Sequence, residues 1–269
     1  MPGRSEWEHL GGRERPSWYL DPLVAQQKRR LFRCLVRAWT GDFVPATVLK
    51  TDLFEEAFGG DHLLFDLLPA GYTPLGMDLS LLTARRAKQN FPAARAGFLT
   101  ADVRRLPLKP GTVDLILSTS TLDHFDTREE FQSSVEELAR VLRPGGLLII
   151  SVDNPLNPLY HPLRWLSRWR RAPFTLGYTT SGGGLARSLE VSGLEVAFTG
   201  CLIHNPRIVS TLLFLGVRRL AGSRADAVIG FLLGGFALLD RLPTRRFTAC
   251  FVAACARKPA DSDILSVSN

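Results

Sequence analysis

The sequence predicts an α/β protein built on a doubly wound, mostly parallel sheet. Short apolar runs bounded by Gly, Pro and Asp alternate with helical patterns along residues 46–152, which is typical of strands joined by crossover helices. One run, 147–152, has five apolar residues out of six, as expected for a parallel strand buried on both faces. A chain of 269 residues with 45% hydrophobic residues can bury the core of one large domain.

The expected elements follow in chain order. Residues 1–20 carry Gly, Pro and charge without a period and are expected to form a loose arm. Residues 21–40 have apolar positions at helical spacing, with Asp21 as N-cap and Pro22 in the first turn, and are expected to cap the core or to form the entrance to a site. Strands are expected at 46–52, 73–78, 96–102, 112–118, 147–152 and 246–258, helices at 61–68, 81–90 and 128–142, and a further helix and strand within 181–203.

Two apolar segments, 208–217 and 227–239, precede the last expected strand. Each is shorter than the ~20 residues that a membrane-spanning helix requires, so two inserted helices are predicted. The expected organisation is therefore an arm and capping helix at 1–40, an α/β domain at 41–258 with a helical insertion or lid at 206–243, and a flexible tail at 259–269.

The formal charge of +7 and the pI of about 9.6 would favour an acidic partner. Because the arginines are scattered along the chain, solvated arginine is the preferred interpretation, and a nucleic-acid partner is not expected. The basic segment 164–171 carries two tryptophans and is interpreted as a helix with packed tryptophans.

The N-terminal residues are charged throughout and lack the apolar run of a secretory signal, so a cytoplasmic location is expected. Contact with a membrane surface through 208–239 is a further expectation. The cysteines are not spaced as in zinc sites, and no metal is expected.

Two aspartates stand at the ends of expected strands, where an open α/β sheet binds its ligand. Asp78 ends the second strand and can accept two hydrogen bonds from a ribose diol. Asp102 ends the third strand and can accept from an adenine amine, while the N–H of Val103 meets the ring. Either aspartate alone is more often a helix cap, but the pair in this order indicates an adenosine site.

The segments GMDLS (76–80), ADVRRLPLKPGTVDLILSTSTLDHF (101–125) and ELARVLRPGGLLIISV (137–152) resemble the class I S-adenosylmethionine-dependent methyltransferases, in particular the group that includes ubiquinone and menaquinone methyltransferases. The resemblance covers about Val48 to Val152. It implies a Rossmann-like, seven-stranded sheet with a final antiparallel strand, and S-adenosylmethionine as the cofactor.

The resemblance also implies roles for individual residues. Asp78 corresponds to the family's ribose-binding acid and Asp102 to its adenine-contacting acid, and Ser118 and Thr119 fall where the fourth strand contacts the methionine part of the cofactor.

The first loop departs from the family. Asp52, Phe54 and Glu56 stand where the family has small residues in a glycine-rich turn. Three explanations stay open: Asp52, Glu55 or Glu56, next to Thr51, meets the cofactor's cationic ammonium or sulfonium; Gly59 and Gly60 supply the turn; or the site has degenerated and binds nothing.

The resemblance predicts methyl transfer to a small-molecule or lipid-like acceptor, with a hydroxyl acceptor slightly favoured by nearby candidate bases. The expected catalytic residues are Asp123 and His124, beside the end of the fourth strand. Tyr160, His161 and His204 are further candidates. The alternative is a methyltransferase-like binding or accessory protein without turnover. A nicotinamide oxidoreductase is disfavoured because no GxGxxG follows the first strand.

Overall fold

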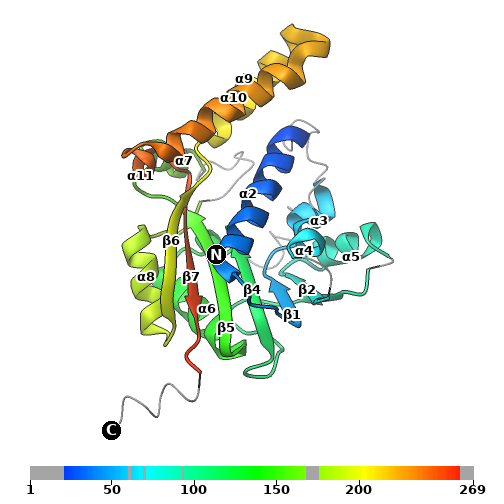
Figure 1. The fold of residues 1–269 in the computed structure, drawn as a ribbon, viewed down its shortest axis with the longest axis vertical. Helices are drawn as coiled ribbons and strands as arrows, with labels where there is room; N and C mark the ends of the chain where they lie inside the picture. Colours follow the sequence, from blue (N-terminus) through cyan, green and yellow to red (C-terminus); the bar gives the residue numbers. More distant parts are fainter. Residues whose placement is uncertain (1–20, 60–61, 69–70, 93, 168–175, 261–269) are drawn as a thin grey trace.

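The structure, a computed structural model, describes residues 21–59, 62–68, 71–92, 94–167 and 176–260. Its centre is a seven-stranded sheet in the order β3-β2-β1-β4-β5-β7-β6 (Figure 1). Strands β1 to β5 pair in parallel, and β7 is antiparallel to both β5 and β6. The predicted α/β sheet with a final antiparallel strand is therefore confirmed. The strands are β1 (Thr47–Lys50), β2 (Thr73–Asp78), β3 (Gly97–Thr100), β4 (Val113–Thr119), β5 (Leu142–Asp153), β6 (Glu195–Leu202) and β7 (Phe251–Arg257).

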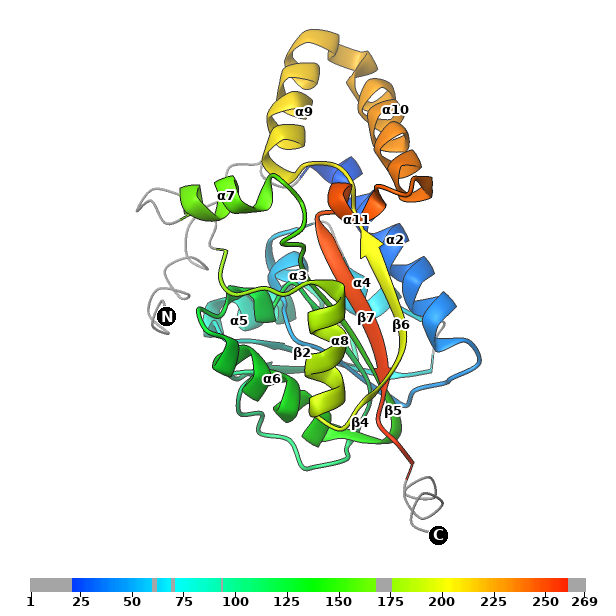
Figure 2. The ribbon, with the colours of Figure 1, turned by 90° about the vertical axis from the view of Figure 1, so that its left-hand side faces the viewer.

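Helices cover both faces of the sheet, because neighbouring strand residues point to opposite sides. Val48 and Leu115 pack against α2 and α4, whereas Leu49 and Ile116 pack in the cluster that includes α6 and α8. Figure 2 shows α6 and α8 on the side of the sheet opposite to α2. The helices are α2 (Pro22–Thr40), α3 (Phe54–Phe58), α4 (Leu63–Asp66), α5 (Leu81–Asn90), α6 (Arg128–Val141), α7 (Tyr160–Ser167), α8 (Gly182–Val191), α9 (Arg207–Ala221), α10 (Ala225–Leu238) and α11 (Arg245–Thr248), with short 3₁₀ turns η2 (Leu122–His124), η3 (Gly222–Arg224) and η4 (Leu239–Arg241).

Most of the expected elements are confirmed, and the differences have local causes. Strand β5 begins directly after α6, five residues earlier than expected, because its first residue, Leu142, already pairs with Val113 before the register shifts. Strand β7 begins later than expected because 245–248 form α11. Helix α3 was not expected, since the segment was interpreted as an irregular loop.

Helices α9 and α10 form a hairpin that projects beyond the carboxyl ends of the parallel strands (Figures 1 and 2). The chain reverses at Gly222, whose φ of +51° favours glycine. Phe214, Ile229 and Leu233 join the two helices in an apolar cluster, against which Leu23 at the start of α2 packs. The hairpin therefore occupies the expected insertion before the last strand, and α2 supports it.

Candidate cofactor and acceptor cavity

A cavity of about 780 Å³ lies at the carboxyl ends of the strands. Its volume falls in the range of about 300–1,000 Å³ that is usual for ligand sites. The chain segments after β1, β2, β3 and β4 line one side, and α2, α9, α10 and the end of β6 line the other. The cavity therefore lies between the sheet and the helical cover, where an open α/β sheet binds its ligand.

Asp78 lies at the end of β2 and lines this cavity. Its carboxylate accepts the backbone N–H of Ser80 at 2.8 Å and that of Leu53 at 3.2 Å, which ties β2 to the first loop. Burial, together with the nearby charge of Asp52, raises the pKa of Asp78 to about 7. A buried acid held near its titration point gains when donors or cations approach it.

Asp102 and Val103 line the cavity after β3. The carboxylate of Asp102 accepts Arg104 Nε at 3.0 Å, and Arg104 also donates to Glu130 at 2.7 Å. Partial burial alone would raise the pKa of Asp102, but the Arg104 guanidinium lowers it below its usual range. A ligand amine at Asp102 would therefore share a carboxylate that already holds an arginine.

A buried ion pair replaces the glycine-rich turn after β1. Lys50 ends this strand, and its Nζ lies 2.8 Å from Glu56 Oε2, with the two side chains 1% and 0% exposed. Lys50 also donates to the Asp52 carbonyl, and Glu56 accepts the N–H of Leu64 at 3.1 Å. Burial alone would lower the pKa of Lys50, but Glu56 and Asp52 raise it. Glu56 therefore holds α3 and α4 in place and does not line the cavity.

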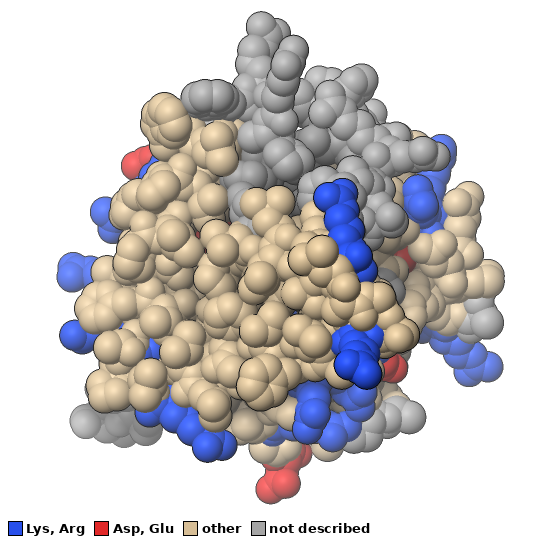
Figure 3. Space-filling model, turned by 90° about the horizontal axis from the view of Figure 1, so that it is seen from above, with Lys and Arg blue, Asp and Glu red and all other residues tan. Residues whose placement is uncertain are grey.

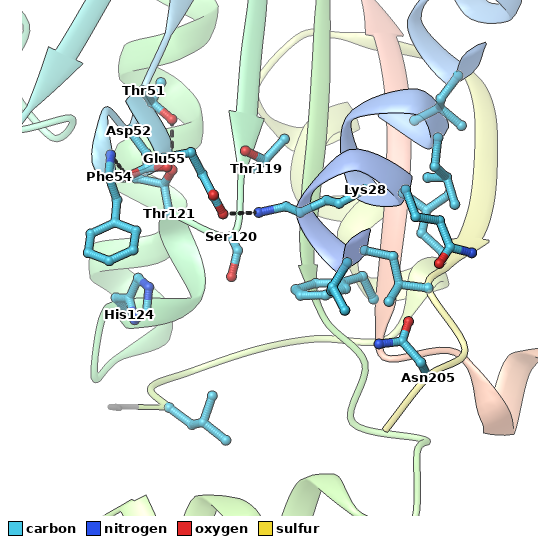
Figure 4. A pocket seen from close by; sticks show the side chains of 18 of the residues that line it. Lys28, Thr51, Asp52, Phe54, Glu55, Thr119, Ser120, Thr121, His124 and Asn205 are labelled. Atoms are coloured by element: carbon cyan, nitrogen blue, oxygen red, sulfur yellow. Dashed lines mark hydrogen bonds and ion pairs between the residues drawn. The ribbon is translucent and has the colours of Figure 1, made fainter. Parts of the chain in front are cut away.

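Asp52 and Glu55 do line the cavity (Figure 4). Asp52 Oδ1 accepts the N–H of Phe54 at 2.9 Å, and Glu55 Oε1 accepts Lys28 Nζ at 2.6 Å. Lys28 comes from α2, so this bridge joins the capping helix to the first loop. Gly59 follows α3 with φ −96° and does not line the cavity, while Gly60 lies outside the described residues. Asp52 and Glu55 are therefore placed to meet the cationic groups of a ligand, whereas Glu56 is not.

The ends of β1 and β4 contribute hydroxyl groups. Thr51 and Thr119 line the cavity, and the Thr51 hydroxyl contacts that of Thr121 at 2.9 Å. Ser118 is fully buried, receives a hydrogen bond from Thr51 at 3.0 Å and does not line the cavity, because alternate residues of a strand face opposite sides. Ser120 lines the cavity with φ +51°, a strained backbone conformation for a residue with a side chain.

The candidate bases separate into two groups. His124 and His204 line the cavity. Asp123 does not: it is 1% exposed and accepts the backbone N–H of Asp153 at 2.8 Å, so its carboxylate holds β5 to η2. Tyr160 is buried and donates to the Gly177 carbonyl, and His161 also lies outside the lining.

His204 lies beyond the end of β6. Its Nδ1 contacts the Thr248 hydroxyl at 2.8 Å, and its Nε2 lies 3.5 Å from Asp240 Oδ1. Burial lowers the pKa of His204, against the opposing effect of Asp240. The neighbouring Ile203, a β-branched residue at φ +57°, also lines the cavity. These strained positions were not signalled by any sequence pattern.

A capping helix and a helical lid were predicted, but the residues of these helices that line the cavity were not. The α2 side chains Gln27, Lys28 and Leu31 and the α10 residues Phe236 and Ala237 line the cavity. They carry no motif, and only the packing of these helices over the strand ends brings them to the site.

Comparisons with known proteins agree with this geometry. Residues 55–150 match the family described as "Methyltransferase domain". An uncharacterised methyltransferase of Synechocystis sp. is 33% identical over 105 residues, which is 39% of this chain and 48% of that protein. The 2-methyl-6-phytyl-1,4-hydroquinone methyltransferase of the same organism is 27% identical over 190 residues, 65% of this chain and 57% of that protein.

Among solved structures, the N-methyltransferase NodS of Bradyrhizobium japonicum, in complex with S-adenosyl-l-homocysteine, superposes with a TM-score of 0.58 at 13% identity. The match covers 95% of this chain and 98% of that one. At this identity, the similarity shows the fold alone.

Residues 55–150 therefore resemble a methyltransferase domain, and the fold is that of the class I S-adenosylmethionine-dependent methyltransferases. These matches support the predicted enzyme class and its cofactor, S-adenosylmethionine. The chain spans about half the length of the curated relatives that it matches, 48% and 57% of the two described here.

Proposed function

We propose that this chain transfers a methyl group from S-adenosylmethionine to an apolar, lipid-like acceptor. The observation that supports it most is the division of the cavity. Its sheet side carries acids and hydroxyls, including Asp52, Asp78 and Thr119, whereas its outer side carries apolar residues such as Leu163, Leu202 and Phe236. A polar cofactor and an apolar acceptor would each find a matching surface.

The residues present fit S-adenosylmethionine. Asp78 suits the ribose diol, and Asp102 with Val103 suits the adenine, as in the family. The ligand's ammonium and sulfonium suit Asp52 and Glu55, and Glu55 Oε2 is buried without a hydrogen-bond partner among the described residues. Bound S-adenosylmethionine would supply a methyl group on a cationic sulfur, so the chain's main task is to align it with the acceptor.

His204 is the base that we propose for a hydroxyl acceptor. Its lowered pKa keeps the imidazole neutral near pH 7, and Nε2, which has no hydrogen-bond partner among the described residues, would take the hydroxyl proton. Asp240, 3.5 Å from Nε2, would stabilise the imidazolium that forms. His204 also lies on the side of the cavity formed by β6 and the hairpin, where apolar residues gather. His124 is the second candidate, on the side of η2.

A hydrophobic acceptor is also suggested by a relative. The Synechocystis protein named above acts, by its name, on a phytyl-substituted hydroquinone, which combines hydroxyl groups with an apolar chain. Only 57% of that protein is matched, so the acceptor of this chain is inferred from its own cavity.

The second candidate function is binding without turnover, favoured by one observation. The first loop is filled by the Lys50–Glu56 pair and by Phe54, where the family has a glycine turn. The experiment below distinguishes this function from catalysis.

The test is transfer of labelled methyl from S-adenosylmethionine to a panel of quinols, hydroxylated lipids and water-soluble phenols. We expect label in the organic-soluble products. The rate of His204→Gln should be lower by a factor of about 10² or more, since a general base contributes at least that much. His161→Gln, an exposed histidine outside the cavity, is the matched control. Binding of S-adenosylmethionine without transfer to any acceptor would favour the accessory function.

A further inference from the structure

One end of the molecule exposes most of its large apolar side chains. Thirteen of the eighteen such side chains in the described part of the chain lie on or beside α7, α9 and α10. We call this surface the apolar end. Its members are Leu156, Leu159, Trp165, Leu166, Val209, Leu212, Leu213, Leu220, Val228, Phe231, Leu238, Leu242 and Phe247.

Trp165 is 63% exposed, so the expectation of packed tryptophans is wrong for this residue, and Trp169 lies outside the described residues.

Helix α9 has two apolar faces. Phe214 faces the cluster with α10 and is buried, whereas Leu212, Leu213 and Leu220 are 62%, 43% and 90% exposed. On α10, Ile229 is buried and Phe231 is 81% exposed. A helix that is apolar on all sides is normally buried in a core or in lipid. The hairpin is not buried by this chain, so its outer surface requires another explanation.

The charge of the hairpin region is strongly positive. Residues 207–248 contain seven arginines, two aspartates and no lysine or glutamate. Asp226 lies 3.0 Å from Arg218, and Asp240 faces His204. Figure 3, a view onto this end, shows a broad surface without charged side chains and with Lys and Arg around its margin. An apolar surface with a basic margin complements an anionic lipid surface, and the arginines would repel a second copy of the same surface.

The hairpin is too short to span a bilayer. One stretch of the described residues, Val209–Arg241, is apolar and long enough for a membrane span by length and composition, and 17% of its most apolar window is buried. However, the chain reverses at Gly222, which leaves arms of 15 and 14 residues. At about 1.5 Å per residue, each arm measures about 22 Å, less than the ~30 Å of a hydrocarbon core. The geometry suits a hairpin lying in the interface.

We propose that the apolar end docks this protein onto the surface of an anionic lipid bilayer. Leu212, Leu220 and Phe231 would enter the interface, and Arg219 and Arg224 would contact lipid headgroups. The same hairpin lines the cavity through Ser210, Phe236 and Ala237, so docking would place the cavity's apolar side next to the membrane. Docking stands independently of catalysis, whereas uptake of a lipid-like acceptor from the membrane rests on the proposed function.

Co-sedimentation of the full chain with vesicles tests the proposal. We expect binding to strongly anionic vesicles of phosphatidylcholine with about 30% phosphatidylglycerol, and weak binding to vesicles of pure phosphatidylcholine. Leu212→Glu combined with Phe231→Glu should reduce binding roughly tenfold or more. Arg219→Ser and Arg224→Ser should each reduce it roughly fivefold, and added salt should remove the difference.

The controls keep the result interpretable. Val191→Glu and Val44→Glu change residues that are 69% and 83% exposed but lie far from the apolar end in sequence and fold, and should bind as wild type does. Calorimetry with S-adenosylhomocysteine on every variant shows whether the cavity is intact, so loss of docking is distinguished from failure of the proposed function. Wild-type protein that does not bind anionic vesicles would overturn the proposal. So would a vesicle-free dimer that Leu212→Glu converts to a monomer, because the apolar end would then be a self-association surface.

Discussion

At the scale of single residues, Asp78 favours ligand binding at the expense of stability. Asp78 is held in a buried position beside Asp52, where its charge is unfavourable without a ligand, and its pKa is about 7. Asp102 has the opposite property, because Arg104 favours its charged form. These two carboxylates, which the sequence pattern treats as equivalent strand-end acids, therefore differ in their electrostatics.

This difference predicts a pH-dependent effect of Asp78→Asn on stability. A carboxyl whose pKa rises on folding binds extra protons in the folded state, so its contribution to stability falls as the pH rises from 3.8 to about 7. Asp78→Asn should therefore raise the free energy of unfolding by about 1–2 kcal/mol at pH 8 and by less at pH 5. Urea unfolding at both pH values measures this.

Asp102→Asn is the comparison for this prediction. Because the pKa of Asp102 is lowered on folding, its contribution to stability is present at neutral pH and is lost in acid, so the substitution should destabilise the protein at pH 8. An Asp78→Asn variant that is destabilised equally at pH 5 and pH 8 would contradict the assigned environment of Asp78.

A second prediction concerns the charge of the first loop. If Asp52 faces the cofactor's sulfonium, Asp52→Asn should weaken binding of S-adenosylmethionine on the order of fivefold more than binding of S-adenosylhomocysteine, whose sulfur is neutral. The Asn side chain can still accept the N–H of Phe54, so the loop should keep its shape. Glu55→Gln tests the neighbouring acid. Equal losses for both ligands would indicate contact with the ammonium, which they share.

The residues that line the cavity were predictable in part. Asp78, Asp102, Val103 and Thr119 stand at strand ends, where topology alone brings side chains to one edge. Ser118 and Asp123 lie within one residue of the lining, and only the direction of each side chain separates them from Thr119 and His124. Lys28 could not be predicted, because its place depends on how α2 packs over the loop.

At the scale of elements, the first loop replaces glycines by a small helical unit with a buried ion pair. Helix α3 fills the space after β1, and the Lys50–Glu56 pair fixes it to the sheet. Sequence periodicity could not predict α3, because its five residues are too few to show a helical period. The longer elements were predictable. For example, the sequences of β2 and α5 show a complete strand pattern and a complete helix pattern, each bounded by residues that end the pattern.

The buried pair predicts a large effect of single substitution. Lys50→Met leaves Glu56 buried without its cation and should cost about 3–5 kcal/mol of unfolding free energy, whereas Lys50→Met combined with Glu56→Gln should recover part of the loss. Lys28→Met breaks a partly exposed pair with Glu55 and should cost about 1 kcal/mol or less. Urea unfolding of the four proteins decides this. A Lys50→Met variant no less stable than Lys28→Met would show that the buried pair does not hold the loop.

At the scale of the whole molecule, the sheet and the helical cover contribute different surfaces to one cavity. The strand ends provide the acids, and α2, α9 and α10 provide the apolar wall. Most of the exposed apolar side chains lie on or beside α7, α9 and α10. The insertion of two helices was predictable from their apolar runs, whereas their projection as a hairpin depends on the turn at Gly222. The acceptor and the docking of the apolar end stay proposals, as does the cytoplasmic location.

The central claim is that the cavity at the strand ends binds S-adenosylmethionine with its ribose at Asp78. Calorimetric titration of the chain with S-adenosylmethionine and S-adenosylhomocysteine tests it most directly. We predict saturable binding of both ligands, weakened roughly 10- to 150-fold in Asp78→Ala through loss of a charge-assisted hydrogen bond, and unchanged in Glu136→Ala, an exposed acid on α6. Absence of binding for both ligands, or equal affinity in wild type and Asp78→Ala, would contradict the claim.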